Sequence, residues 1–173
     1  MVETAQYLTL GLDGETFGIG IRNVREILDM RPISKIPHAP NFLLGMIDVR
    51  GTSYPIVDLR IKLDLPSVPA TEATRIIILD VPLGDRFVGV GFVADCVFEV
   101  TDLDEGRLEA PPSIGGRWKS DYLAGLGRKG DKFVLIFDLA KLMTATPEIE
   151  AATGPDTDGS QRDERSLGTP VAA

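Results

Sequence analysis

The segments LLGMIDVRGTSYPIVDL, residues 43–59, and LAGLGRKGDKFVLIFDL, residues 123–139, decide the fold of this chain. Each has strand-like apolar runs on both sides of a turn, the pattern of a β-hairpin. The two segments match at one offset, in the pairs Leu43/Leu123, Gly45/Gly125, Ile56/Ile136, Asp58/Asp138 and Leu59/Leu139. A second pair, FGIGIRNVREI at 17–27 and VGVGFVADCVFEV at 88–100, repeats in the same order. The pattern indicates two copies of a hairpin–loop–hairpin unit.

Two more hairpins complete the copies. Residues 7–21 alternate on both sides of the Asp13-Gly14 step, and residues 75–93 turn at 83–85. Residues 22–28, RNVREIL, fit either a short helix or a bent strand. Loops are predicted where Pro, Gly, Ser and Thr gather, around 32–40, 64–74 and 111–116. The fold class is therefore all-β, with two small β-barrels that share an interface because each is too small to bury a large core alone.

Composition limits the function classes. The chain has 173 residues and a formal net charge of −8, so a nucleic acid is not expected as its partner, because phosphate binding needs a basic face. Cys96 is the one cysteine, which indicates a reducing compartment. The first ten residues lack the features of a signal peptide, and no run approaches the ~20 apolar residues of a membrane span. We expect a cytoplasmic protein without direct membrane insertion.

The last thirty residues differ from the rest. Residues 144–173 show no apolar period, are rich in Thr, Gly, Pro, Asp and Ser, and carry a net charge of −4. Such a segment cannot bury enough apolar surface to offset its ordering entropy. The sequence therefore predicts a domain over residues 1–143, followed by a disordered acidic tail over 144–173.

No pattern of catalytic or metal-binding residues is visible. His38, the one histidine, lies between prolines with no nucleophile motif in the chain, and it is interpreted as a half-exposed loop residue. Cys96 is interpreted as a small buried hydrophobe, and one His with one Cys supplies no metal cluster. Asp58 and Asp138 follow apolar strands and could be paired catalytic carboxylates, but helix N-caps fit them better. We expect no enzyme activity, no metal and no cofactor.

Arg50 is the residue best suited to recognition. It lies at the tip of the hairpin 43–59, between Val49 and Gly51. Arginine at a partly apolar surface is enriched at binding hot spots, because its guanidinium can bind a carboxylate while its stem packs. Asp48 would point to the same side of an extended strand, so a simple Asp48–Arg50 ion pair is the structural alternative.

At this point the sequence resembles the CheW family of bacterial chemotaxis coupling proteins. The resemblance is carried, in order, by VREIL at 24–28, IPHAPNFLLGMIDVRGTSYPIVDLRIKL at 36–63, RIIIL at 75–79, and the segments 87–100 and 122–143. It covers about Tyr7 to Met143. It implies a fold of two intertwined five-stranded SH3-like β-barrels with short helices, and a non-enzymatic adaptor.

The resemblance also implies partners and sites. CheW-like proteins connect the cytoplasmic tips of chemoreceptors to the regulatory domain of the histidine kinase CheA, and they join other CheW-like domains in array rings. Arg50 and Gly51 correspond to the family's Asn-Leu-Arg-Gly turn, and Glu26 to an acidic receptor-binding position. A groove near Val24, Ile27 and Val49 would accept a receptor helix.

For the kinase contact, the surface around Val88, Val90 and Val93 is a candidate. Two departures from the family pattern stand out: Asp48 replaces the asparagine of the turn, and His38 replaces the Asn of a Pro-Asn-Ala-Pro segment. The alternative function is a small β-barrel that binds another ligand or an oligonucleotide. It would need a basic, aromatic-lined groove, whereas aromatics make up 6% of this acidic chain.

Overall fold

The computed structural model describes residues 5–103, 108–110 and 122–144. Its strands are β1 (Gln6–Leu12), β2 (Glu15–Gly20), β3 (Val24–Asp29), β4 (Leu43–Val49), β5 (Thr52–Asp58), β6 (Arg75–Leu83), β7 (Arg86–Ala94), β8 (Cys96–Asp102), β9 (Leu123–Lys129) and β10 (Lys132–Phe137). Its helical segments are the 3-10 turn η1 (Ile21–Asn23) and the short helices α1 (Leu59–Lys62) and α2 (Leu139–Thr144).

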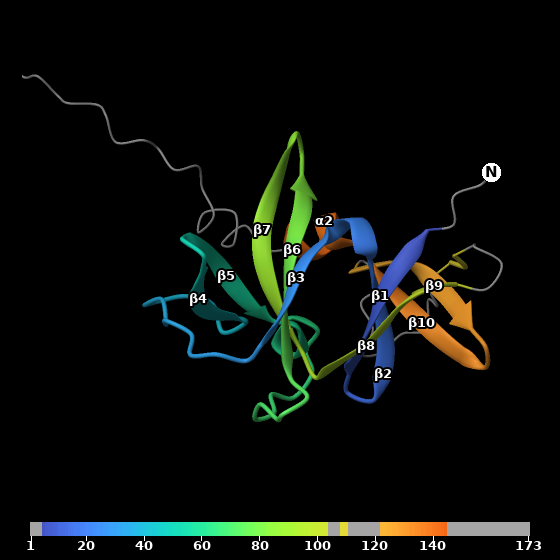
Figure 1. Ribbon diagram of the computed structural model, residues 1–173, viewed down its shortest axis with the longest axis horizontal. Helices are drawn as coiled ribbons and strands as arrows, with labels where there is room; N and C mark the ends of the chain where they lie inside the picture. The colour runs from blue at the N-terminus through green and yellow to red at the C-terminus, as the bar shows by residue number, and fades with distance from the viewer. Residues whose placement is uncertain (1–4, 104–107, 111–121, 145–173) are drawn as a thin grey trace, which may run out of the picture.

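The strands form two five-stranded curled sheets that exchange strands (Figure 1). Barrel A has the order β8-β1-β2-β10-β9, and barrel B has the order β3-β6-β7-β5-β4. Each barrel therefore takes one hairpin from one half of the chain and three strands from the other half. In barrel A the single hairpin is β1–β2, and in barrel B it is β6–β7. The halves meet in the parallel pairs β2–β10 and β5–β7 and in the antiparallel pairs β1–β8 and β3–β6, and the remaining pairs are antiparallel hairpins within one half. The expected all-β fold of two intertwined barrels is confirmed.

Four two-residue turns close the hairpins. In the first half, Asp13-Gly14 and Arg50-Gly51 have positive φ at both positions, as in a type I′ turn. In the second half, the turns begin at Gly84 and Gly130, and only that first position has positive φ, as in type II′. Both types match the right-handed twist of the flanking strands. The first three turns lie where the sequence predicts them, and the fourth lies within the predicted hairpin of residues 123–139.

Three apolar clusters hold the fold together. The largest contains buried residues of both sheets and of both short helices, such as Phe17, Leu59, Phe92 and Leu142, so it forms the interface between the barrels. A second cluster fills barrel B with seven buried residues. A third, inside barrel A, has only Leu103, Val134 and Ile136 buried, with part of Tyr7 against them. Most of the core is thus shared.

The structure repeats itself at the offset found in the sequence. Asp58 donates its backbone N–H to the oxygen of Phe42, and Asp138 donates its own to Tyr122, at 2.8 and 2.9 Å. Asp58 also caps α1 through the Arg60 N–H at 2.9 Å. Asp138 caps α2 in the same way through the Lys141 N–H at 3.0 Å. The interpretation of both acids as helix caps is confirmed.

Several sequence-based expectations are refined. Residues 22–28 form neither a helix nor one bent strand, because η1 ends at Asn23 and β3 begins at Val24. Residues 88–100 divide between β7 and β8, which belong to different sheets, so β8 is a strand that hairpin counting missed. Cys96 is half-buried rather than buried, and His38 is exposed in its loop. The loop at 111–116 and the tail lie outside the described residues, apart from Thr144, which ends α2.

Candidate functional site

The turn between β4 and β5 is shaped by its own residues. Arg50 and Gly51 have φ values of 51° and 84°, and the Gly51 N–H donates to Asp48 Oδ1 at 2.8 Å. Asp48 therefore stabilises the turn through the backbone. The alternative in which Asp48 pairs with the Arg50 guanidinium is not what the structure shows.

Arg50 pairs instead with Glu26 on β3. The guanidinium Nη2 donates to Glu26 Oε1, which joins the tip of the β4–β5 hairpin to the edge strand at the other end of the same sheet. The Arg50 side chain is 76% exposed and that of Glu26 is 28% exposed. The structure thus brings together the two charged residues that the resemblance singled out. A partner can reach the arginine without unfolding anything.

Arg25, beside Glu26, makes a second contact between β3 and the β4–β5 hairpin. Its Nη1 donates to the Tyr54 hydroxyl on β5 at 3.0 Å, and its Nε lies 3.3 Å from Asp80 Oδ2 on β6. Sequence reasoning missed these three residues. An aromatic hydroxyl and an acid on neighbouring strands carry no local signal, because their meeting depends on how the sheet curls.

The apolar residues expected around the groove differ in access. Ile27 is 41% exposed and is available for contact, and Val24 is half-buried. Val49 is only 9% exposed and belongs to the cluster inside barrel B. Its expected place on the groove surface is therefore wrong for its side chain, because alternation along β4 turns Val49 inward.

The expected surface at residues 88–93 is also corrected. Val88 and Val90 are 6% and 0% exposed, so their side chains lie in the core and do not form the expected surface. Val93 is half-buried against the cluster of barrel B. A continuous apolar strand looks the same in sequence whether it faces a partner or a second sheet. The exposed apolar residue of this strand is Phe87, next to the turn, at 68%.

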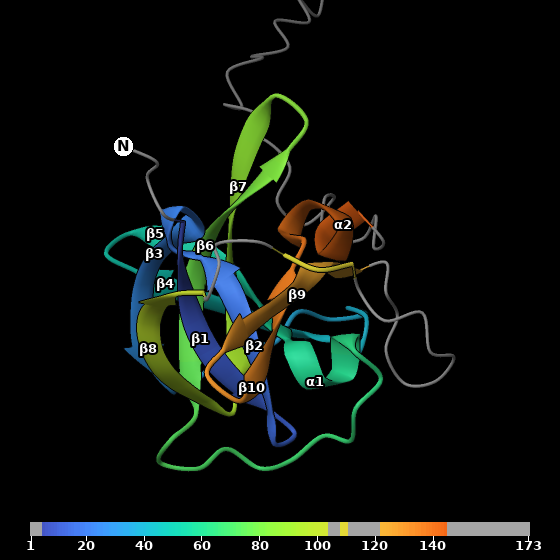
Figure 2. The same cartoon turned by 90° about the vertical axis from the view of Figure 1, so that its right-hand side faces the viewer.

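Strand β8 adds apolar surface that the sequence analysis did not assign. Phe98 and Val100 are 58% and 47% exposed. Figures 1 and 2 both place β8 and β3 on the same face of the molecule. Val100 follows Glu99 in β8 as Ile27 follows Glu26 in β3, so the two repeats present an apolar residue at matching positions.

A charged cluster around the buried Arg60 connects the two barrels. The Arg60 guanidinium binds both carboxylate oxygens of Asp95, at 2.8 and 2.7 Å, and donates to the Pro66 oxygen at 3.0 Å. Asp13, in the β1–β2 turn, donates its N–H to Asp95 Oδ2 at 2.9 Å. The cluster thus ties a turn of barrel A to the helix that follows β5 of barrel B.

The contacts in this cluster shift the pKa values of its members. The hydrogen bonds to Asp95 raise the pKa of Arg60. Burial opposes ionisation of Asp95, but the Arg60 guanidinium and the Asp13 N–H together outweigh that effect and bring the pKa of Asp95 below its ordinary value. Burial raises the pKa of Asp58 instead. The charges satisfy one another, which is the arrangement of a structural ion pair.

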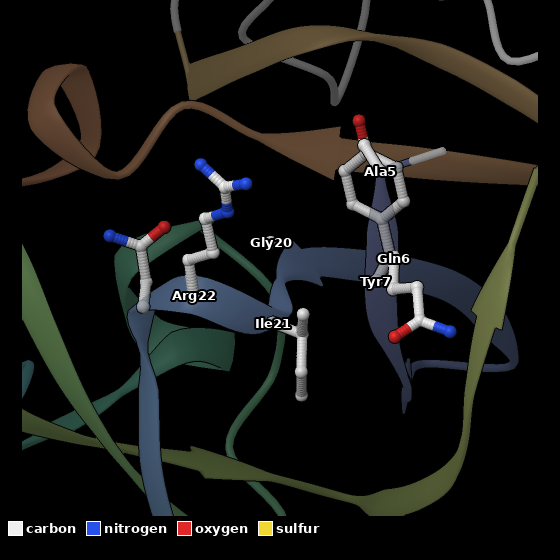
Figure 3. A pocket seen from close by; sticks show the side chains of 7 residues that line it. Ala5, Gln6, Tyr7, Gly20, Ile21 and Arg22 are labelled. Atoms are coloured by element: carbon white, nitrogen blue, oxygen red, sulfur yellow. The ribbon is translucent and has the colours of Figure 1, made fainter. Parts of the chain in front are cut away.

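The described part of the chain offers little for bond-making chemistry. Within it, no group of three His, Cys, Asp or Glu side chains could hold a metal ion, and no helix is long and apolar enough to cross a membrane. A cavity of about 380 Å³ lies between the start of β1 and η1 (Figure 3). It is lined by Ala5, Gln6, Tyr7, Gly20, Ile21, Arg22 and Asn23. These groups can hydrogen-bond but include no acid, thiol or imidazole.

Two curled sheets that share a core, with an exposed ion pair on one face, define a protein-interaction module. Comparison with known proteins identifies its family. A CheW-like domain matches residues 6–146, so this chain belongs to the CheW family.

Individual relatives agree with this assignment. The chain is 32% identical over 140 residues to a chemotaxis protein CheW of Klebsiella aerogenes, which covers 81% of this chain and 82% of the relative. It is 26% identical to a chemotaxis protein CheW of Rhizobium meliloti, over 88% of this chain and all of the relative. The crystal structure of the scaffolding protein TtCheW from Thermoanaerobacter tengcongensis matches with a TM-score of 0.72 and 29% identity, over 82% of this chain and 89% of that one.

Proposed function

We propose that this protein is a non-enzymatic chemotaxis adaptor. It couples the cytoplasmic tips of chemoreceptors to the regulatory domain of the histidine kinase CheA, and it joins other CheW-like domains in the rings of the array. It acts in the cytoplasm, recruited to receptor clusters. The observation that carries the proposal is the Arg50–Glu26 ion pair, displayed on barrel B in a chain that belongs to the CheW family.

The geometry suits recognition of a helix. A receptor helix that lays its apolar face on the surface bearing β3 would meet Ile27, with Glu26 and Arg50 beside it. Because the Arg50 side chain is mostly exposed, separating the ion pair costs little, and a partner carboxylate can bind one side of the Arg50 guanidinium. The pair therefore acts as an adjustable polar contact at the border of an apolar one.

Substitution of Arg50 tests the proposal. Arg50→Ala and Arg50→Glu should leave the fold intact, with a loss of less than about 1 kcal/mol of unfolding free energy, because an exposed ion pair contributes little. Receptor-dependent stimulation of CheA should fall about tenfold or more, since loss of a binding hot spot costs that much in affinity. The measurements are co-sedimentation with receptor-containing membranes and CheA autophosphorylation.

Arg128 provides the matched control. Its side chain is 57% exposed and paired with Glu109 at 2.9 Å, but it lies on barrel A. Arg128→Ala should co-sediment and stimulate as the wild type does. Full kinase stimulation by folded Arg50→Glu protein would contradict the proposed role of Arg50.

A further inference from the structure

The two barrels differ at the end that carries the β4–β5 turn in barrel B and the equivalent β9–β10 turn in barrel A. In barrel B the seam between β3 and the β4–β5 turn is closed by the Arg50–Glu26 and Arg25–Tyr54 contacts. The Tyr54 ring also covers Gly89, where an added Cβ would lie 2.6 Å from Tyr54 Cε1. The interior behind it is filled by the other six buried residues of the cluster inside that barrel.

Barrel A is open at this end. A cavity of about 220 Å³ lies between β8 and the β9–β10 turn. It is lined by Thr9, Thr16, Phe98, Glu99, Thr101, Lys129, Lys132 and Val134. Val134 is 2% exposed and forms its floor, whereas the Phe98 ring is 58% exposed and forms a wall.

The repeat explains the opening. At the offset that relates Asp58 to Asp138, Val134 takes the place of Tyr54, and Gly130 takes the place of Arg50. Val134 covers Gly18 together with Ile136, and Val134 Cγ1 and Ile136 Cδ1 would lie 3.1 and 2.6 Å from an added Cβ. Val134 lacks the ring with which Tyr54 covers Gly89. The cavity is therefore the space that a tyrosine occupies in the other half of the molecule.

The charged residues at the edge of the cavity favour an acidic ligand. Lys129 and Lys132, the pair that flanks the β9–β10 turn, correspond to Val49 and Thr52 of barrel B. Both lysines are exposed and line the cavity. The acid on the lining, Glu99, comes from β8 on the other side. A peptide segment bound in the cavity would therefore place its acidic groups near the lysines of the β9–β10 turn and away from Glu99.

The size of the cavity sets the kind of occupant. Pockets for small-molecule ligands usually enclose about 300–1,000 Å³, so this cavity suits a single large apolar side chain. We propose that the open end of barrel A binds a protein partner through one aromatic or large aliphatic side chain, flanked by acidic residues that contact Lys129 and Lys132. The site is separate from the Arg50 surface on barrel B.

A peptide titration tests this proposal. The probe is a blocked nonapeptide with one Phe between two Glu on each side, added to the full-length ¹⁵N-labelled protein. The amide signals of Thr9, Thr16 and Val134 are expected to shift in a saturable way. The same peptide with Lys in place of Glu should bind about tenfold more weakly or worse, because it meets the two lysines.

Two variants separate packing from charge. Val134→Tyr places in barrel A the residue that barrel B has, and it should weaken binding about tenfold or more by filling the cavity. Lys129→Glu/Lys132→Glu leaves the core untouched and should weaken binding of the acidic probe to a similar extent. Arg50→Ala should bind the probe as the wild type does, so failure here is distinguishable from failure of the adaptor function.

Three results would overturn the proposal. One is the absence of shifts at these amides up to millimolar probe. A second is equal affinity for the acidic and basic probes. A third is a dependence of the same signals on protein concentration without any peptide, which would assign the opening to a second copy of this chain.

Discussion

At the scale of single residues, glycine decides where two backbones can meet. The backbone N–H groups and oxygens of Ser34 and Met46 pair at 2.9 and 2.8 Å beside Gly45, whose φ is 146°. A Cβ on Gly45 would lie 2.1 Å from the Ser34 oxygen. The bridge from Glu109 to Leu126, beside Gly125, repeats this contact in barrel A. These glycines let a loop cover the outer edges of β4 and β9.

Gly45→Ala should therefore destabilise the protein strongly. Both the clash with a backbone oxygen and the positive φ oppose a side chain, so we expect a loss of about 3 kcal/mol or more, measured by urea unfolding. Gly51→Asn is the control, since asparagine tolerates positive φ and no atom lies within 4 Å of an added Cβ there. It should cost less than about 1 kcal/mol. Equal losses would show that the Ser34 contact is not what requires Gly45.

At the scale of elements, one ion pair holds a turn, a helix and a strand end together. Arg60 of α1 binds Asp95, which in turn accepts the N–H of Asp13 in the β1–β2 turn. The position of Arg60 in the second half is Ala140, so only one of the two equivalent junctions has this tie. The repeat is thus symmetric in its backbone and in its helix caps, but not in this ion pair.

The tie should make stability depend on pH. The pKa of Asp95 is lowered in the folded state, so its contribution is present above the unfolded value of about 4 and is lost as the pH falls through the folded value. Asp95→Asn should cost about 2 kcal/mol at pH 7, and this difference should shrink as the pH falls below about 4. Urea unfolding at several pH values measures it.

Two other acids serve as comparisons for Asp95. The pKa of Asp58 is raised by burial, so its charged form costs stability at neutral pH, and this cost is relieved as the pH falls through the folded value. Asp102→Asn, at an exposed end of β8, is the surface control and should change the free energy of unfolding by less than about 0.5 kcal/mol at pH 7. A difference between Asp95→Asn and the wild type that stays constant from pH 7 to pH 3 would count against the ion pair as its source.

At the scale of the whole molecule, neither half of the chain holds a complete barrel. Strands β1 and β2 need β8, β9 and β10, while β3, β4 and β5 need β6 and β7. The largest cluster also draws buried residues from both halves, and the Phe17 and Phe137 rings stack across them with centroids 4.8 Å apart. The fold is therefore one cooperative unit, which suits an adaptor that must keep two faces in a constant relation.

Fragments should show this dependence. Division of the chain in the exposed loop between Ala70 and Thr71 yields residues 1–70 and 71–173, each with an incomplete set of strands for both barrels. Each fragment alone should lack dispersed amide signals and a cooperative thermal transition, and both should appear on mixing. A cooperative transition in residues 1–70 alone would contradict the exchanged topology.

The sequence by itself determined the hairpins, their turns, the repeat, the helix caps and the family. These are local features, set by alternation, by turn residues such as Asp13-Gly14, and by the fixed offset between the halves. The resemblance also singled out Arg50 and Glu26, but residue patterns alone did not pair them.

Only the tertiary structure decided which surfaces are available. It turned Val49, Val88 and Val90 inward, exposed Phe98 and Val100, and left barrel A open where Val134 replaces a tyrosine. The physical reason is that alternation tells which residues share a face of a strand, but not whether another sheet covers that face. The exchange of strands between the halves settles that question, and it depends on contacts far apart in the chain.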